Sequence, residues 1–128
     1  MKKLVSLKKL GVMLLCFSLL LVFPTIASAR YSYISDVQSS FIISSGGQAT
    51  CGGEVWGKQI YPVSITVELQ QKQSNGSWLT VASWSDSATA YFARAAGSYS
   101  VPSGYTYRCY VTGTIYGENG YASVEKRY

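Results

Sequence analysis

Residues 104–116, GYTYRCYVTGTIY, decide the fold class of this chain. Large apolar residues, cysteine and glycine occupy every second position, and arginine, tyrosine and threonines lie between them. A period of two is that of a β-strand with one buried side, because successive side chains point to opposite faces. The predicted inward residues are Tyr105, Tyr107, Cys109, Val111, Gly113 and Ile115. The predicted outward residues are Arg108, Tyr110, Thr112, Thr114 and Tyr116.

Two earlier segments show the same alternation. Residues 48–56 place Ala49, Cys51, Gly53 and Val55 on one side, and residues 63–69 place Val63, Ile65, Val67 and Leu69 inward. For residues 77–85 the alternation does not decide which face is inward. Leu79 and Val81 favour one face as the core side, and Trp78 and Trp84 favour the other.

Seven segments have the composition of strands, and no segment has helical periodicity. They are residues 33–44, 48–56, 63–73, 77–85, 89–95, 104–116 and 121–126. The dipeptide Asn75-Gly76 predicts a tight hairpin, because both residues accept positive φ. Residues 117–120, GENG, predict a second one. Short strands with a turn about every ten residues predict an all-β antiparallel sandwich or barrel.

The first 29 residues have the composition of a secretory signal peptide. Four lysines in residues 2–9 precede an apolar run over residues 10–23, which Pro24 ends before Ala27-Ser28-Ala29. The alternative is a permanent anchor, but the run is shorter than the ~20 residues needed to span a bilayer. We therefore expect cleavage after Ala29 and a secreted single domain, residues 30–128, without a stable membrane anchor.

Removal of that leader changes the charge and the cysteine count. Four of the 11 basic residues leave with it, so 7 basic residues remain against 6 acidic ones, and basicity no longer predicts a nucleic-acid partner. Cys51 and Cys109 remain, both with inward parity. Two cysteines of a small exported domain usually pair, so we expect a disulfide between the two sheets of a sandwich. The alternative is two separate buried thiols.

The order of these residues resembles the immunoglobulin-like domains. The resemblance consists of Cys51 on the second strand and Tyr107-Arg108-Cys109 on the last strand but one. It implies a sandwich of about seven strands and a structural tyrosine corner, in which the Tyr107 hydroxyl bonds a backbone group within residues 97–103. The third strand has no tryptophan, so the chain is similar to bacterial immunoglobulin-like or fibronectin-like domains rather than to antibody domains. In overall build it also resembles small secreted proteins of Gram-positive bacteria that belong to uncharacterised families.

Several kinds of chemistry are excluded by residue type. The chain has no histidine, which excludes Ser-His-Asp and Cys-His nucleophile systems and the usual zinc sites. There is no glycine-rich phosphate loop, and we expect no cofactor. Glu54 and Glu68 can face each other on neighbouring strands, as a glycosidase would need, but solvated strand residues are the simpler interpretation. We expect no enzyme activity.

Aromatic residues are the unusual feature, with 11 tyrosines, all after the leader. Arg108, Tyr110 and Tyr116 form the candidate binding surface, because tyrosine combines a flat apolar ring with a polar tip. The alternative is that these are ordinary outward residues of a sheet, and that Trp56, Trp78 and Trp84 are core or loop-covering residues. The predicted function is a secreted non-catalytic binding or interaction module, with an unknown protein or glycan partner at the bacterial cell surface or in the medium. A glycan- or cell-wall-binding module, a bacteriocin-like toxin or effector, and an assembly subunit that pairs through edge strands remain alternatives.

Overall fold

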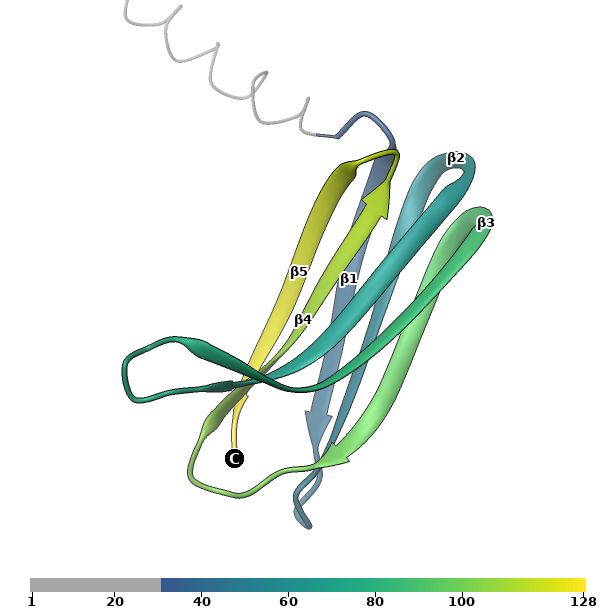
Figure 1. Ribbon diagram of the computed structural model, residues 1–128. Helices are drawn as coiled ribbons and strands as arrows, with labels where there is room; N and C mark the ends of the chain where they lie inside the picture. The colour runs from purple at the N-terminus through teal and green to yellow at the C-terminus, as the bar shows by residue number, and fades with distance from the viewer. Residues whose placement is uncertain (1–30) are drawn as a thin grey trace, which may run out of the picture. The chain divides into compact units, whose positions relative to one another are not determined.

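The computed structural model describes residues 31–128, and Tyr33–Tyr128 form one compact unit. The expected signal peptide and its cleavage site lie outside the described residues. Five strands make up the unit (Figure 1): β1 (Ile34–Ile43), β2 (Gln48–Lys72), β3 (Trp78–Ser100), β4 (Thr106–Ile115) and β5 (Glu118–Arg127). All pairings are antiparallel, so the all-β antiparallel prediction is confirmed. The described part of the chain contains no helix of the length and hydropathy that a membrane span requires.

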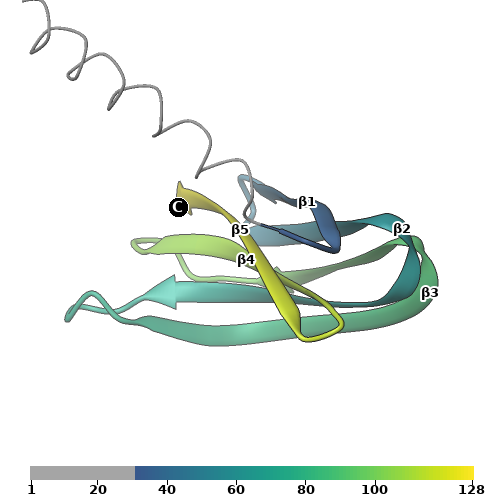
Figure 2. The same cartoon turned by 90° about the horizontal axis from the view of Figure 1, so that it is seen from above.

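One curled sheet contains all five strands, because β2 and β3 are long and bent. The first half of β2 pairs with β1 and with the second half of β3. The second half of β2 pairs with β4 and with the first half of β3, and β5 pairs with β4. The curl brings β1 over β4 and β5, as the view from above shows (Figure 2). The structure therefore has five strands where seven segments were expected.

The difference in strand number arises at the corner of β2. The pairing register of β2 with β3 shifts between Trp56 and Tyr61, and such an irregularity bends a strand while its backbone stays extended. A Cβ on Gly57 would lie 2.9 Å from the carbonyl oxygen of Gln59 and 3.1 Å from the Tyr61 ring, so the corner requires glycine there. Residues 48–56 and 63–73, predicted as two strands, are therefore the two halves of β2, apart from Gln73.

The core lies inside the curl and follows the predicted parity. Alternate residues of β4 are buried, and so are the predicted inward residues of β2. The exception is Tyr105, which is exposed because it precedes β4 in the loop that Gly104 turns with a φ of +93°. The fully buried side chains of largest volume include Tyr107, Ile34, Ile65, Leu69, Ile115, Val55, Val63, Val67 and Val111.

The inner faces of the first half of β2 and of β4 approach each other closely at two glycines, Gly53 and Gly113. A Cβ on Gly53 would lie 2.7 Å from the side chain of Val111, and a Cβ on Gly113 would overlap Val55. Each glycine therefore provides the space that a valine of the facing strand fills. Close interdigitation of this kind gives protein cores their density, and it holds the inner faces together.

A bulge settles the open question about residues 77–85. Leu69 is opposite Ala82, but Gln70 is opposite Thr80, so Val81 is an extra residue in β3. An extra residue reverses the parity of everything beyond it. Trp84 is therefore on the core side, where a Cβ on Gly97 would overlap its indole, and Trp78 is on the outward side opposite Lys72. The two tryptophans share a parity in the sequence and lie on opposite faces in the fold.

Candidate binding face

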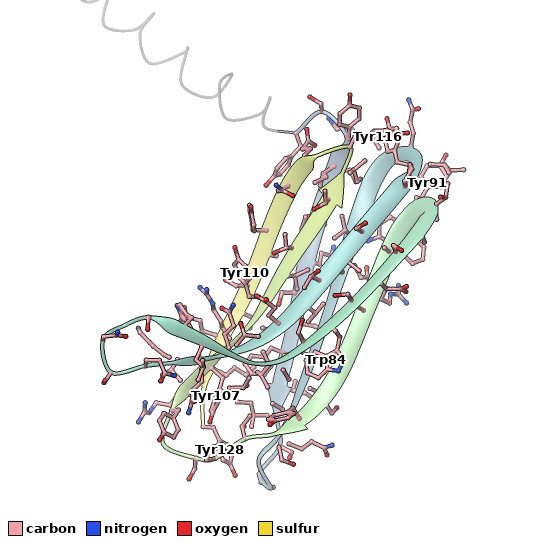
Figure 3. All side chains as sticks on the ribbon, viewed as in Figure 1. Trp84, Tyr91, Tyr107, Tyr110, Tyr116 and Tyr128 are labelled. Atoms are coloured by element: carbon pink, nitrogen blue, oxygen red, sulfur yellow. The ribbon has the colours of Figure 1, made fainter. Side chains whose placement is uncertain are left out.

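The outward face of β4 and its neighbours carries a row of stacked side chains. Arg108 and Tyr110 alternate along β4 with the buried Tyr107, Cys109 and Val111. The bulge in β3 turns Trp78 to this face, and the pairing of Thr112 with Tyr121 places the latter there from β5. We call Trp78, Arg108, Tyr110 and Tyr121 the aromatic row; the side chains in this part of the molecule are drawn in Figure 3.

The rings and the guanidinium of the aromatic row are in contact along its length. The Cζ of Arg108 lies 4.3 Å from the centroid of the Trp78 ring and 4.6 Å from that of Tyr110. The rings of Tyr110 and Tyr121 stack with centroids 5.9 Å apart and planes 26° apart. Lys72 extends the arrangement, with its Nζ 5.9 Å from the Trp78 ring. Each cation–π contact at such a partly exposed place contributes about 0.5–1 kcal/mol.

A chain of hydrogen bonds fixes the guanidinium in this position. Arg108 Nε donates to Gln70 Oε1 at 2.6 Å, and Gln70 Nε2 donates to Glu68 Oε2 at 2.9 Å. Gln70 is only 8% exposed, although it points to the outward face, because its neighbours cover it. The aromatic row therefore has its conformation set before any partner arrives, and such preorganisation lowers the entropy cost of binding.

The predicted surface of Arg108, Tyr110 and Tyr116 is divided by the structure. The first two lie together, whereas Tyr116 lies in the two-residue turn between β4 and β5, with a φ of 49°. Its ring makes edge contacts with Tyr33 and Tyr61, at centroid distances of 5.3 and 5.4 Å. The expectation that Tyr116 belongs to the outward face of the strand is wrong, because the pairing of Ile115 with Glu118 ends the strand one residue earlier.

Sequence reasoning missed Trp78, Tyr121 and Gln70 as parts of this face. Trp78 was expected in the core or under a loop, because an uninterrupted period of two gives it the parity of Trp84. The pairing of Tyr121 with Thr112 depends on the position of the turn between β4 and β5. The sequence motif predicted this turn at residues 117–120, which is later than its position in the structure, at residues 116 and 117. No signal in the sequence marks Val81 as the bulged residue.

The two cysteines are adjacent in the core but are not bonded to each other in this structure. Both thiols are fully buried, and a hydrogen bond joins them. That hydrogen bond raises the pKa of the Cys51 thiol, and burial adds to the effect. For Cys109 the same hydrogen bond lowers the pKa while burial acts in the opposite direction. The fold thus places the cysteines together on facing parts of the curled sheet, and the expected disulfide stays a prediction.

Tyr107, expected as a structural residue, is fully buried on the face that also holds Cys109. Its hydroxyl donates a hydrogen bond of 2.6 Å to the backbone carbonyl of Pro102. Pro102 lies within the loop that the immunoglobulin-like resemblance indicated.

The pair of carboxylates considered for glycosidase chemistry is separated by the bend of β2. Glu54 forms an ion pair with Arg94 at 2.7 Å and accepts a hydrogen bond from Trp56 Nε1, on the outward side of the first half of β2. Glu68 lies on the second half and bonds Gln70. Their facing arrangement, considered from sequence, is therefore wrong. Within residues 31–128, no group of three or more Asp, Glu, Cys or His residues is arranged to hold a metal ion.

The face that carries Glu54 has a shallow depression of about 230 Å³. Small side chains leave this space, because Ser40, Gly52 and Ala96 are opposite one another on β1, β2 and β3. Beyond the ion pair, the rings of Trp56 and Phe92 stack at 4.6 Å. This face has one aromatic stack and one ion pair, whereas the aromatic row spans β3, β4 and β5.

Comparison with known proteins gives a partial likeness to a solved structure. No protein-family model and no curated protein matches the sequence. Among solved structures, the sporulation control protein Spo0M of Bacillus subtilis is similar, with 12% sequence identity and a TM-score of 0.45. The alignment covers 76% of this chain and 49% of Spo0M, so the chain spans about half the length of that protein. A likeness of this extent assigns neither a family nor a function. The chain forms a curled, antiparallel, all-β domain with a stacked aromatic row on one outward face.

Proposed function

We propose that residues 30–128 form an exported, non-catalytic binding module that acts at the bacterial cell surface or in the medium. The leader-like composition of residues 1–29 and the two cysteines left after its removal support export. The absence of histidine and the separation of Glu54 from Glu68 support a role without catalysis.

We also propose that the curled sheet is a variant of the immunoglobulin-like sandwich, in which β2 and β3 each supply two strands. Support comes from the pairing pattern: β1 and halves of β2 and β3 form one side, and the other halves with β4 and β5 form the second. The buried, adjacent Cys51 and Cys109 fit the place of an inter-sheet bridge.

The aromatic row is the observation that carries the binding function. Trp, Tyr and Arg are the residues most enriched among those that dominate the energy of protein interfaces. Here they are held rigid by stacking and by the hydrogen bonds of Arg108 through Gln70 to Glu68. Within the row, Arg108 lies against the rings of Trp78 and Tyr110, and Tyr121 stacks on Tyr110, so these neighbours cover one another's ring faces. This arrangement favours a protein partner over a sugar stacked on an open ring.

A glycan remains the second candidate because of one residue. Tyr121 ends the row, is 54% exposed, and has one ring face that the stacking with Tyr110 does not cover. An open ring at the end of a row is the kind of platform on which a sugar ring stacks.

Binding measured with matched variants tests the proposal. Purified residues 30–128 would be immobilised and exposed separately to detergent-solubilised cell-surface proteins and to purified cell-wall glycan. We expect retention of a surface protein by the unsubstituted domain, loss of retention with Tyr110→Ser or Arg108→Lys, and no loss with Tyr99→Ser, an exposed tyrosine at the far end of β3. Retention of glycan alone would assign the second candidate. Equal retention by all variants would exclude the aromatic row as the site.

The same variants need a stability control. Tyr110→Ser removes one stacked ring and one cation–π contact at a partly exposed place, so we expect a cost of about 1–2 kcal/mol. Arg108→Lys keeps the charge but loses the planar guanidinium between the rings and the bond to Gln70. Both variants should therefore fold, and a loss of binding then reports on the surface.

A further inference from the structure

A cluster of three tyrosines lies at the end of the domain where the chain enters β1. The centroids of Tyr33 and Tyr61 are 5.6 Å apart, and Tyr116 is 5.3 and 5.4 Å from them, with all three pairs edge to face. The three come from the segment before β1, from the corner of β2, and from the turn after β4. Since Tyr33 and Tyr116 are 38% and 63% exposed, the cluster forms part of the surface.

Two further exposed side chains extend this cluster. Ile60 precedes Tyr61 in the corner of β2 and is 59% exposed. Tyr91 lies in the bend of β3, next to the residue that pairs with Tyr61, and is 54% exposed. Figure 3 shows Tyr91 and Tyr116 at the same end of the molecule. We call Tyr33, Ile60, Tyr61, Tyr91 and Tyr116 the aromatic tip.

Basic groups lie near the tip. Lys58 is exposed, and its backbone N–H donates to the carbonyl of Tyr33, so it lies beside the start of the domain. If the leader is removed after Ala29, the new α-amino group and Arg30 stand three residues before Tyr33. One acidic residue, Glu118, also lies here, and its Oε1 accepts hydrogen bonds from the backbone N–H groups of Tyr33 and Ile34.

We propose that the aromatic tip rests on a membrane surface that contains anionic lipid. Tyrosine suits the boundary between water and acyl chains, because its ring is apolar and its hydroxyl polar, and Ile60 supplies a fully apolar contact. Basic groups beside such side chains add attraction to anionic headgroups. The side chains project from four separate segments: the chain before β1, the bends of β2 and β3, and the turn after β4. A soft, adaptable surface fits such a discontinuous set better than a second rigid copy of the chain.

The length of the chain before the tip supports a lipid surface as the occupant. Residues 24–32 separate the apolar run of the leader from Tyr33. Nine extended residues span about 30 Å at most. During export Tyr33 would therefore stay within about 30 Å of the membrane that holds the leader, and cleavage after Ala29 would leave a positive charge at this same end of the chain.

This contact would orient the aromatic row. The β2–β3 hairpin that carries Trp78 lies at the other end of the second half of β2 from the corner with Ile60 and Tyr61 (Figure 1). With the tip on the lipid, the row is directed away from the surface along β4. The tip is independent of the proposed binding function, and either can fail alone.

Sedimentation with protein-free vesicles tests the proposal. Tyr33–Tyr128 hold the whole described core as one unit, so we expect residues 30–128 to fold without the leader. We expect them to sediment with phosphatidylcholine vesicles that contain phosphatidylglycerol, and less with phosphatidylcholine alone or at high salt. Ile60→Ser with Tyr91→Ser should weaken binding about tenfold, since two apolar contacts are lost. Lys58→Glu should weaken binding to the anionic vesicles by a similar factor.

Two matched variants separate this surface from others. Tyr99→Ser and Tyr110→Ser lie outside the tip and should sediment as the unsubstituted protein does, which keeps the result distinct from loss of the aromatic row. No sedimentation with anionic vesicles, or unchanged sedimentation of both tip variants, would overturn the proposal. So would a dimer in analytical ultracentrifugation that Ile60→Ser with Tyr91→Ser dissociates, because the occupant would then be a second copy. Lys58→Glu is an exposed substitution in the corner and keeps the test valid if the double variant does not fold.

Discussion

The hydroxyl of Tyr107 donates a hydrogen bond of 2.6 Å to the backbone carbonyl of Pro102, and the ring below it is fully buried. Burial raises the pKa of this phenol above its usual value, so the hydroxyl stays a donor across the ordinary pH range. The bond ties the loop between β3 and β4 to the inner face of β4. Through this one side chain, the loop in which the chain reverses direction is attached to the core.

Tyr107→Phe should lower the free energy of unfolding by about 1 kcal/mol, or by more if the carbonyl of Pro102 finds no other donor. Urea unfolding of purified residues 30–128 measures this cost. The matched control is Tyr105→Phe, which removes a hydroxyl from an exposed neighbour and should have little effect. Equal stability of all three proteins would show that the hydrogen bond contributes nothing net.

Gly97→Ala should destabilise the domain, because the added Cβ would overlap the indole of Trp84. Trp84 extends from the first half of β3 and covers the second half near Cys51, so its displacement opens one edge of the curl. We expect a cost of about 1–3 kcal/mol, as for overpacking elsewhere. Gly46→Ala is the control, since the nearest atom to its Cβ would be Ser44 Oγ at 3.9 Å. A neutral Gly97→Ala would mean that Trp84 moves aside freely.

Cys51 and Cys109 should form a disulfide in the exported protein. The two thiols are adjacent and buried, and an oxidising compartment allows them to pair. Labelling of the unfolded, unreduced protein should therefore detect no free thiol, and Cys51→Ala should cost about 2–5 kcal/mol. Labelling of both cysteines would support two buried thiols instead.

The reduced protein should lose stability at high pH, relative to the oxidised protein. The pKa of Cys51 is raised in the fold, whereas in the unfolded chain it is near 9.0. Below that pH both states hold the Cys51 proton, and its stabilisation is complete. Cys109 acts with the opposite sign: its pKa is lowered in the fold to about 7, so between about pH 7 and pH 9 the folded chain releases this proton first and the free energy of unfolding rises. Above pH 9.0 the unfolded chain releases the Cys51 proton and the folded chain keeps it, so the free energy of unfolding falls as pH rises. Urea unfolding from pH 7 to pH 10 with and without reductant measures the difference; parallel curves would contradict it.

Export should remove the first 29 residues. The sequence Ala27-Ser28-Ala29 has the small side chains that signal peptidases accept, so the secreted protein should begin at Arg30. Intact mass and N-terminal sequencing of protein from culture supernatant test this. Ala29→Leu, which replaces a small residue at the cleavage site, should reduce release. Recovery of the chain from membranes alone, with the leader retained, would exclude secretion.

Two features could be predicted from local conformational preferences alone: the hairpin between β2 and β3, and the inward face of β4. The Asn75-Gly76 hairpin is confirmed, since the backbones of Gln73 and Ser77 are hydrogen-bonded across the turn. Of the two residues only Gly76 has a positive φ, of 85°, so the expected positive φ at Asn75 is wrong. The inward face of β4 is also confirmed from Tyr107 to Ile115. In both cases the deciding physics lies within a few residues, either a backbone angle or the alternation of side chains along one strand.

Which aromatic residues share a surface depends on how the strands pair, and this pairing could not be predicted from the sequence. Tyr116 and Gly117 form the turn with φ values of 49° and 77°, so Tyr116 leaves the face of Tyr110 and packs with Tyr33 and Tyr61. A left-handed tyrosine is unfavourable locally, and the ring contacts at the tip offset that cost.

The sequence by itself determined that the chain is all-β, which residues of β2 and β4 are buried, and that Cys51 and Cys109 share the core. Only the tertiary structure decided that Trp78 faces out while Trp84 faces in, and that Tyr110 and Tyr116 belong to different surfaces. The reason is that one bulged residue, Val81, and one corner, at residues 57–60, shift the register of whole strand halves. Gly57 permits the corner, but the register on each side of the corner and of Val81 depends on the pairing of β3 with β2, far along the chain.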